Sequence, residues 1–181
     1  MLDSSLQPTR PYPRVPPPLV EDLAQDFAVL LEAVLEVDGP HQALRFLNSM
    51  TANRCSGLYR FDGGMLTNLQ LVDSEDPAVT SAAAVPVDES YCVFVRASGR
   101  PFVVDDSLAD PRVASHRKRQ AIRSYCGVPL SDDEGNTRGT ICHFDPEPNR
   151  TDSLDLVYLD TFAHMVQRPG VGTELRQALH M

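Results

Sequence analysis

Apolar residues near both ends of the chain recur with the period of an α-helix. Residues 21–37 place large apolar side chains at helical spacing, behind two acidic residues in the first turn. An Asp-Gly-Pro sequence at residues 38–40 ends this helix, and residues 41–50 carry a second apolar stripe. Helical spacing returns over residues 153–166. The pattern therefore predicts two helices at the start of the folded chain and one near its end.

In the middle of the chain the period changes to two, which is typical of β-strands. Residues 54–61 and 65–72 alternate on either side of Asp62-Gly63-Gly64 and predict an antiparallel hairpin. Further strands are predicted over residues 81–87, 102–104, 125–130 and 138–144. Pro86 lacks an N–H group, so the first of these four strands is restricted to an edge of the sheet. A short helix is expected over residues 90–97.

This order of elements indicates an α+β fold, in which terminal helices cover one face of an antiparallel sheet. About 35 residues leave the sheet between the third and fifth strands, and excursions of this length in compact domains tend to be functional. We expect this excursion, residues 88–123, to cover the other face, with a ligand pocket beneath it. The proline-rich residues 1–19 are expected to form a disordered arm, residues 20–168 the domain, and residues 169–181 a tail.

Composition narrows the class of protein. The 181 residues are 42% apolar and 23% charged, as in a single globular domain. The sequence contains neither an apolar run of membrane-spanning length nor the zones of a signal peptide, so a soluble cytoplasmic protein is expected. The four cysteines occur without CxxC pairs or suitably spaced histidines, which favours buried free thiols over disulfides or a metal site. The sequence shows no catalytic triad or phosphate-binding glycine loop, so neither an enzyme nor a bound cofactor is expected.

The net charge of −9 argues against binding to nucleic acid or to an anionic membrane. The charge is nevertheless uneven, because residues 112–123 hold five of the 16 cations and no carboxylate. The other eleven cations face 25 carboxylates, so the rest of the chain carries −14. Lys118 is the only lysine, so nearly every cation is a guanidinium, which binds carboxylate and phosphate groups in a bidentate manner.

The spacing i, i+4, i+7 and i+11 is shared by Arg112, His116, Arg119 and Arg123. If this stretch were helical, these four side chains would form one cationic stripe. Such a stripe could bind a carboxylate or phosphate ligand, or it could be a solvated surface that offsets the acidic body. Tyr91 and Phe94 would share a helix face, either as an aromatic wall or as ordinary core. The candidate ligand-binding residues are Tyr91, Phe94, Asp106, Arg112, His116, Arg119, Arg123 and Tyr125.

Two further pairs of residues suggest chemistry. Cys92 and Cys126 would sense oxidants if their thiols had low pKa values near the cationic segment, but inert thiols are favoured. His143 and Asp145 alternate on a predicted strand and are expected to form a hydrogen-bonded structural pair, since no serine nucleophile accompanies them.

Several segments of the chain resemble the GAF domain family. The resemblance rests on Ser-Tyr-Cys-Gly-Val-Pro-Leu at residues 124–130, followed by Gly-Thr-Ile-Cys-His-Phe-Asp at residues 139–145. Residues 99–106, residues 109–112 and the Ser90-Tyr91-Cys92 start of the short helix match in the same order. The resemblance implies a six-stranded antiparallel sheet of PAS-like (profilin-like) architecture with a pocket beneath the excursion. It also implies a bacterial signal-transduction protein with a regulatory ligand-binding or dimerisation role.

Departures from the family's patterns narrow the choice of ligand. The cyclic-nucleotide-binding members usually carry an Asn-Lys-Phe-Asp-Glu pattern, which a chain whose one lysine is Lys118 does not contain. Free methionine sulfoxide reductases of the family carry a cysteine ahead of the fifth strand, and residues 114–123 contain none. The Cys142-His143 pair resembles a bilin attachment pair, but it falls on a predicted strand and not in the excursion.

Three functions remain open on the sequence. The preferred one is a sensor that binds a small anionic or aromatic metabolite and acts on a separate signalling partner by population shift. The second is a ligand-free interaction module, which includes a homodimer through the apolar stripes of residues 21–37 and 153–166. The third is a redox enzyme of the methionine sulfoxide reductase type, which would use Cys92 or Cys126.

Overall fold

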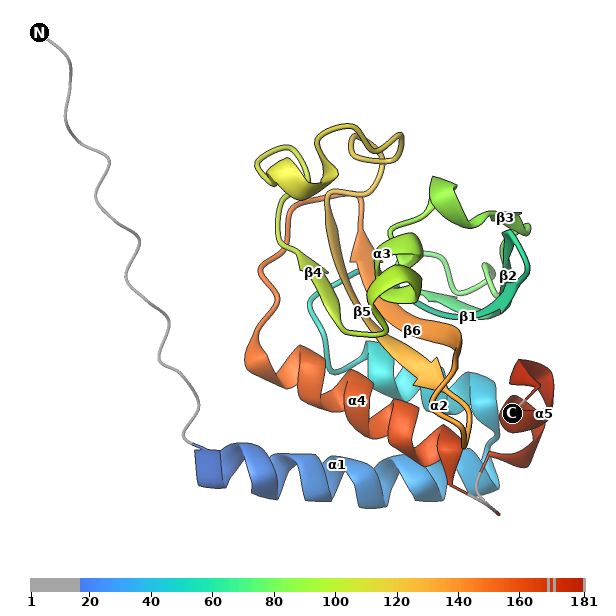
Figure 1. The fold of residues 1–181 in the computed structure, drawn as a ribbon. Helices are drawn as coiled ribbons and strands as arrows, with labels where there is room; N and C mark the ends of the chain where they lie inside the picture. Colours follow the sequence, from blue (N-terminus) through green and yellow to red (C-terminus); the bar gives the residue numbers. More distant parts are fainter. Residues whose placement is uncertain (1–16, 169, 171, 181) are drawn as a thin grey trace, which may run out of the picture.

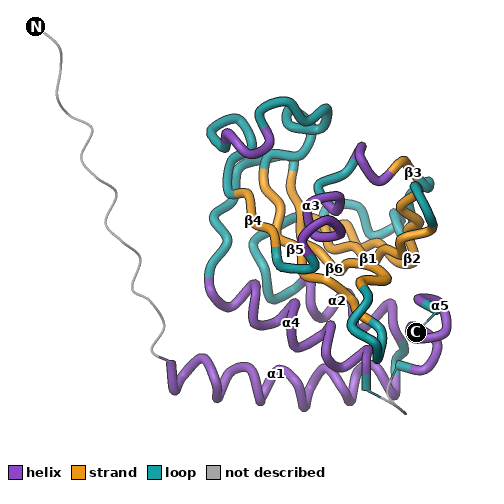
Figure 2. Tube along the Cα trace, viewed as in Figure 1, coloured by secondary structure: helices purple, strands orange, loops and turns teal. Residues whose placement is uncertain are grey.

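A six-stranded sheet forms the centre of the fold (Figures 1 and 2). The computed structural model describes residues 17–168, 170 and 172–180, so most of the expected arm lies outside the described residues. The strands are β1 (Cys55–Asp62), β2 (Met65–Asp73), β3 (Val85–Pro86), β4 (Phe102–Val104), β5 (Ser124–Ser131) and β6 (Thr137–Asp145). They lie in the order β3-β2-β1-β6-β5-β4, and every neighbouring pair is antiparallel. All six predicted strands are present, and β3 lies at an edge as Pro86 requires.

Helices cover both faces of the sheet. They are α1 (Pro17–Val37), α2 (Pro40–Asn48), α3 (Cys92–Ser98), α4 (Ser153–Gln167) and α5 (Thr173–Leu179). Figure 1 shows α1, α2, α4 and α5 on one side of the sheet, and α3 with the loops of the excursion on the other. None of the helices in the described part of the chain is long and apolar enough to cross a membrane.

Alternation along the strands builds a separate core on each face of the sheet. On β6, Ile141 packs under the terminal helices, whereas its neighbour Cys142 faces α3. The first core joins side chains of α1, α2, α4 and α5, such as Phe27 and Leu159, to the sheet. The second core joins α3, β4 and the excursion to the opposite face, around Tyr91. The predicted α+β arrangement is therefore confirmed.

Both ends of the described chain differ from the prediction. α1 begins at Pro17, four residues before the predicted start, because proline fits the first turn of a helix, where an N–H has no intrahelical acceptor. Residues 17–19 therefore belong to the fold and not to the arm. α5 lies within the predicted tail, and its Leu179 is buried in the first core. Arg60 of β1 also donates a hydrogen bond of 2.6 Å to the Ala178 carbonyl, which attaches α5 to the sheet.

The cationic segment, residues 112–123, does not form the helix on which a cationic stripe would depend. After a single 3-10 turn at Pro111–Val113, residues 116–122 form successive tight turns closed by short-range backbone hydrogen bonds. The segment is polar with weak periodicity, and of its apolar side chains only Val113 and Ile122 pack in the second core, so it has no continuous apolar face that would hold a helix against the sheet. The three arginines and His116 therefore do not form the single stripe that a helix would have given them.

Candidate functional site

The second core brings four of the eight predicted site residues together. The ring centres of Tyr91, at the start of α3, and Phe94 lie 6.3 Å apart, and the His116 ring lies 4.6 Å from the Tyr91 ring. Tyr125 of β5 meets Tyr91 edge-on at 5.7 Å. Tyr91 is 0% and Tyr125 is 2% exposed. The predicted aromatic wall therefore exists as packed core, and not as the side of an open pocket.

Two glycines on the sheet beneath α3 make room for tyrosine rings. Gly57 of β1 and Gly127 of β5 are both in register with Cys142 of β6, so the three residues form one row across the sheet. A Cβ atom on Gly127 would collide with the hydroxyl end of Tyr125, and one on Gly57 would collide with the ring of Tyr59. The chain's own side chains therefore occupy the space directly above this row.

Two of the predicted cations are committed to separate carboxylates. Arg112 pairs with Asp110, and its guanidinium lies over the Phe102 ring at 4.8 Å. Arg123 pairs with Asp106 at 2.8 Å. These guanidiniums hold the pKa values of Asp110 and Asp106 below the usual range of a carboxyl group, so both pairs remain charged at neutral pH.

An open groove of about 610 Å³ runs beside β4, at the edge of the predicted site. It is lined by Val103, Asp105, Asp106, Ala109, Asp110, Pro111 and Arg112. Because three carboxylates and one guanidinium line it, this groove disfavours the anionic ligand that the cationic segment suggested. Of the predicted site residues, Asp106 and Arg112 line it.

Two buried polar atoms of the excursion lack a hydrogen-bond partner, namely Nε2 of His116 and Nε of Arg119. His116 Nδ1 accepts a hydrogen bond of 3.2 Å from the backbone N–H of Lys118, so the neutral ring carries its proton on Nε2. Burial lowers the pKa of His116 and favours that neutral ring. The carbonyls of Ser90 and Asp88 lie near the imidazole and oppose this shift, but neither forms a hydrogen bond of normal geometry with Nε2. Within the described residues, both atoms are therefore buried donors without a well-formed hydrogen bond.

These two donors belong to side chains that surround Tyr91. The His116 ring contacts the Tyr91 ring, and burial raises the pKa of the Tyr91 phenol while the nearby Arg119 charge opposes that shift. The remaining guanidinium nitrogens of Arg119 donate to the carbonyls of Ala114 and Leu108 at 2.9 and 3.0 Å. A buried donor without an acceptor costs about 1 to 3 kcal/mol. The region around Tyr91 therefore holds two donors that a ligand atom could satisfy.

All four cysteines are buried free thiols, as predicted. Burial raises the pKa values of Cys126 and Cys55 to about 12, so these thiols stay protonated at neutral pH. Cys92 of α3 lies 3.5 Å from the Tyr125 hydroxyl. Burial opposes the shift, but hydrogen bonds with Cys142, Ser90 and Tyr125 lower the pKa of Cys92, whereas burial raises that of Cys142. Residues 17–168, 170 and 172–180 contain no group of three or more side chains suited to holding a metal ion.

The predicted pairing of His143 with Asp145 is wrong. His143 Nδ1 shares a hydrogen bond of 2.7 Å with Ser56 Oγ, which also accepts one of 2.8 Å from Asn48 Nδ2. Asp145 instead accepts a hydrogen bond of 2.7 Å from the backbone N–H of Arg54. The network joins the end of α2 to β1 and β6. No sequence pattern indicates it, because its members come from three elements far apart in the chain.

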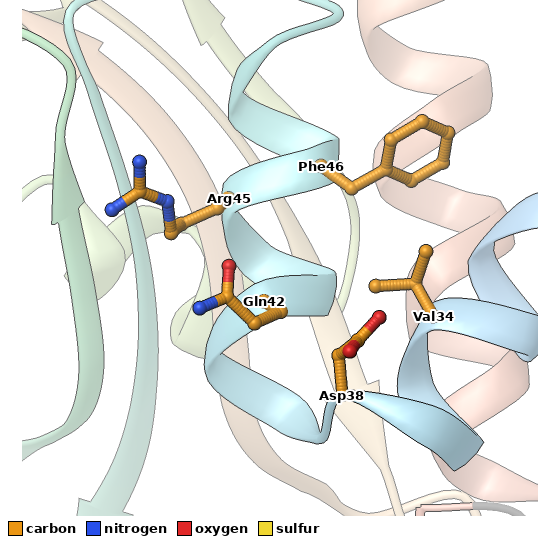
Figure 3. Close-up of a pocket in the computed structure, with 5 residues that line it drawn as sticks. All are labelled: Val34, Asp38, Gln42, Arg45 and Phe46. Atoms are coloured by element: carbon orange, nitrogen blue, oxygen red, sulfur yellow. The ribbon is translucent and has the colours of Figure 1, made fainter.

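A second open groove, of about 580 Å³, lies between the end of α1 and α2 (Figure 3). Val34, Asp38, Gln42, Arg45 and Phe46 line it, and none of these belongs to the predicted site. Figure 3 shows the Arg45 guanidinium turned away from Val34 and Phe46. The groove therefore lacks the convergent polar groups of a small-molecule site.

An antiparallel sheet with helices on one face and an excursion over the other defines a PAS-like α+β domain. Within that class, the model of the GAF domain family matches residues 20–168, and the chain belongs to this family. GAF domains are commonly sensory or regulatory.

Solved structures share the fold at low sequence identity. The GAF domain of a phosphoenolpyruvate-protein phosphotransferase from Acinetobacter has a TM-score of 0.67 and 11% identity, over 88% of this chain and 98% of that one. Free methionine-R-sulfoxide reductase from Neisseria meningitidis, solved in complex with its substrate, has a TM-score of 0.65 and 19% identity, over 88% of this chain and 91% of that one. At such identities the likeness shows the fold alone.

A curated relative matches part of the chain. A cyclic di-GMP phosphodiesterase of Pseudomonas aeruginosa is 33% identical over 85 residues, which are 45% of this chain and 14% of that protein. Because the match spans a small share of the relative's length, it does not extend phosphodiesterase activity to this chain.

Proposed function

We propose that this chain is a regulatory GAF domain that binds a small molecule beneath the excursion and passes the change to a separate signalling protein. The observation that carries the proposal is the pair of buried donors without acceptors, His116 Nε2 and Arg119 Nε, on side chains that surround Tyr91. A ligand with a carbonyl or carboxylate oxygen would satisfy them, and the Tyr91 and Phe94 rings suit a planar or aromatic body.

Binding at this position requires the excursion to move. The second core is filled in the described structure, but tight turns, and not a packed helix, carry His116 and Arg119. Only Val113 and Ile122 fix these turns to the second core through apolar side chains, and segments with few buried apolar contacts open at lower cost than core helices. The ligand would therefore favour an opened arrangement of the excursion over the closed one, which is a shift in population.

Thermal unfolding of the whole chain tests this proposal. The screen would contain nucleotides, keto acids, amino acids and aromatic acids, and a ligand at 100 times its Kd should stabilise the chain by about 2.7 kcal/mol. His116→Phe retains a ring beside Tyr91 but removes the Nε2 donor, so this variant should lose the ligand response. A screen in which no compound shifts the transition contradicts the sensor.

A matched control uses the third buried side-chain atom without a partner, Gln70 Oε1 on β2. Gln70→Leu removes an unsatisfied polar group outside the excursion, so the ligand response should persist. If Gln70→Leu abolished the response as fully as His116→Phe, the effect would be one of general stability and the assignment of the donor would be wrong.

The second candidate function is a ligand-free interaction module. The tyrosine rings over Gly57 and Gly127 favour it, because they fill the space above the sheet without a ligand. The third function, a redox enzyme, is not proposed, because burial holds Cys126 protonated and leaves Cys92 at 1% exposure. Reduction of free methionine sulfoxide by the unmodified protein would contradict this non-enzymatic assignment.

A further inference from the structure

The outward face of α1 carries an apolar strip that no other described residue covers. The strip consists of Leu19, Val29, Leu30, Ala33 and Val37. Its four large members are 48%, 65%, 56% and 81% exposed, and they are four of the seven exposed large apolar side chains among the described residues. Figures 1 and 2 show α1 as the outermost helix on its side of the molecule, with α4 on its inner side. The α1 strip is therefore a concentrated apolar surface and not scattered exposure.

Every charged side chain of α1 is acidic. The helix contains Glu21, Asp22, Asp26, Glu32 and Glu36, and it contains no Lys, Arg or His. Glu32 pairs with Arg168 at 3.3 Å, whereas the other four carboxylates are exposed and have no ion-pair partner among the described residues. Helical rotation places Asp22 and Asp26 on the same side as the α1 strip, and Glu36 at its border.

This charge pattern disfavours a second copy of the chain as the occupant. In a two-fold homodimer the same surface patch meets itself, so the contact would bring two copies of this acidic helix together. Like charges placed together at an interface cost binding energy, and α1 carries no cation that would offset them. An anionic lipid surface is disfavoured for the same reason.

We propose that the α1 strip binds an amphipathic helix of another protein, one with an apolar face bordered by Lys or Arg. Apolar residues at i, i+3 or i+4, and i+7 of that helix would cover Val29, Leu30 and Val37. Its basic borders would lie beside Asp22, Asp26 and the end of α1. From Val29 to Val37 the strip extends for about 12 Å, which two turns of a partner helix can match. This contact does not depend on the ligand site, which lies on the other face of the sheet.

Fluorescence anisotropy with a defined probe tests the proposal on the full chain. The probe is an idealised helical peptide of about 20 residues with leucines on one face and lysines on both borders, and its control carries glutamate for every lysine. The lysine peptide should bind with an affinity that falls as salt is added, and the glutamate peptide should bind about tenfold more weakly or not at all. Equal binding of the two peptides, or no binding of the lysine peptide, overturns the proposal.

Surface variants locate the contact. Leu30→Gln combined with Val37→Gln changes only exposed side chains, so the fold should persist while binding of the lysine peptide weakens about tenfold. Leu108→Gln is the matched control, because Leu108 is 46% exposed in the excursion, across the sheet from α1. If Leu108→Gln weakens binding as much as the α1 pair, the peptide binds non-specifically and the assignment to α1 is wrong.

Light scattering separates the proposed partner from a second copy. The proposal expects the mass of one 20.0 kDa chain when no peptide is present. A particle of twice that mass that Leu30→Gln with Val37→Gln converts to a monomer would show that a second copy covers the α1 strip. That result would overturn the proposal.

Discussion

Tyr125 and Gly127 stand two residues apart on β5, and the ring of the first occupies the place of the side chain that the second lacks. Alternation alone indicates that both residues face the second core. It does not indicate that glycine is required there, because the reason is a contact between the two residues. Tyr59 and Gly57 on β1, on the other side of β6, repeat the arrangement. The two pairs together close the space in which a ligand was expected.

Replacing Gly127 tests this packing. Gly127→Ala should lower the free energy of unfolding by about 1 to 3 kcal/mol, because the added methyl group displaces the buried Tyr125 ring. Urea denaturation measures the change. Gly64→Ala is the control, since a Cβ there meets open space and should change stability by less than about 0.5 kcal/mol. Equal effects of the two substitutions would show that the ring contact is unimportant.

His143 predicts a pH dependence of stability. Burial lowers its pKa to about 3, whereas the unfolded chain binds this proton near pH 6.5. The unfolded state therefore binds more protons between these values. The contribution of the neutral His143 ring to the free energy of unfolding is fully present above about pH 6.5. It is lost as pH falls, by about 1.4 kcal/mol per pH unit, until about pH 3.

His143→Asn removes this titration and retains a polar atom toward Ser56. Between pH 6 and 4, the free energy of unfolding of the variant should fall less steeply with pH than that of the parent chain. The two slopes should differ by about 1.4 kcal/mol per pH unit, which corresponds to one bound proton. Urea denaturation at several pH values gives both slopes. A His143→Asn slope equal to the parent's would refute this assignment.

At the scale of elements, α5 shows how a short helix becomes part of a core. Leu179 lies against Gly139 of β6, where even a Cβ would meet it at 2.8 Å. Seven residues are too few for a helix to be stable alone, so α5 depends on this contact and on the Arg60 hydrogen bond to Ala178.

Leu179→Ala therefore should destabilise the whole domain, by about 2 kcal/mol or more. The loss should appear in the main cooperative unfolding transition measured by circular dichroism, because Leu179 belongs to the first core. Gln177→Ala changes an exposed position of the same helix and should alter stability by less than about 0.5 kcal/mol. A normal transition in Leu179→Ala would mean that α5 is peripheral to the domain.

Sequence periodicity predicts the elements that have a continuous apolar face. The period of two locates β1, β2, β5 and β6, and the helical period locates α1 and α4, because each buries a stripe or face of its own. The same reasoning misses α5, which has only a few apolar residues. It also allows a helical stripe on the cationic segment, where the guanidiniums of Arg112, Arg119 and Arg123 instead bind three separate acceptors.

At the scale of the whole molecule, the charges that make up the net −9 are paired to different degrees in the excursion and in α1. The cations of the excursion are largely paired with nearby carboxylates or carbonyls, whereas α1 keeps four carboxylates without ion-pair partners among the described residues. Charge counting along the chain locates the cations but not their partners. It therefore indicates an anion site at the excursion, while the four α1 carboxylates without ion-pair partners among the described residues lie across the sheet.

Adjacent residues of a strand belong to different cores, so a single peptide unit joins the two faces of the sheet. Tyr125 belongs to the second core and the adjacent Cys126 to the first, where it packs beneath the terminal helices. A ligand under the excursion and a helix on α1 would therefore occupy one scaffold at the same time without competing for space. Any coupling between them must be reciprocal, so the factor by which ligand strengthens or weakens peptide binding equals the factor by which peptide changes ligand binding.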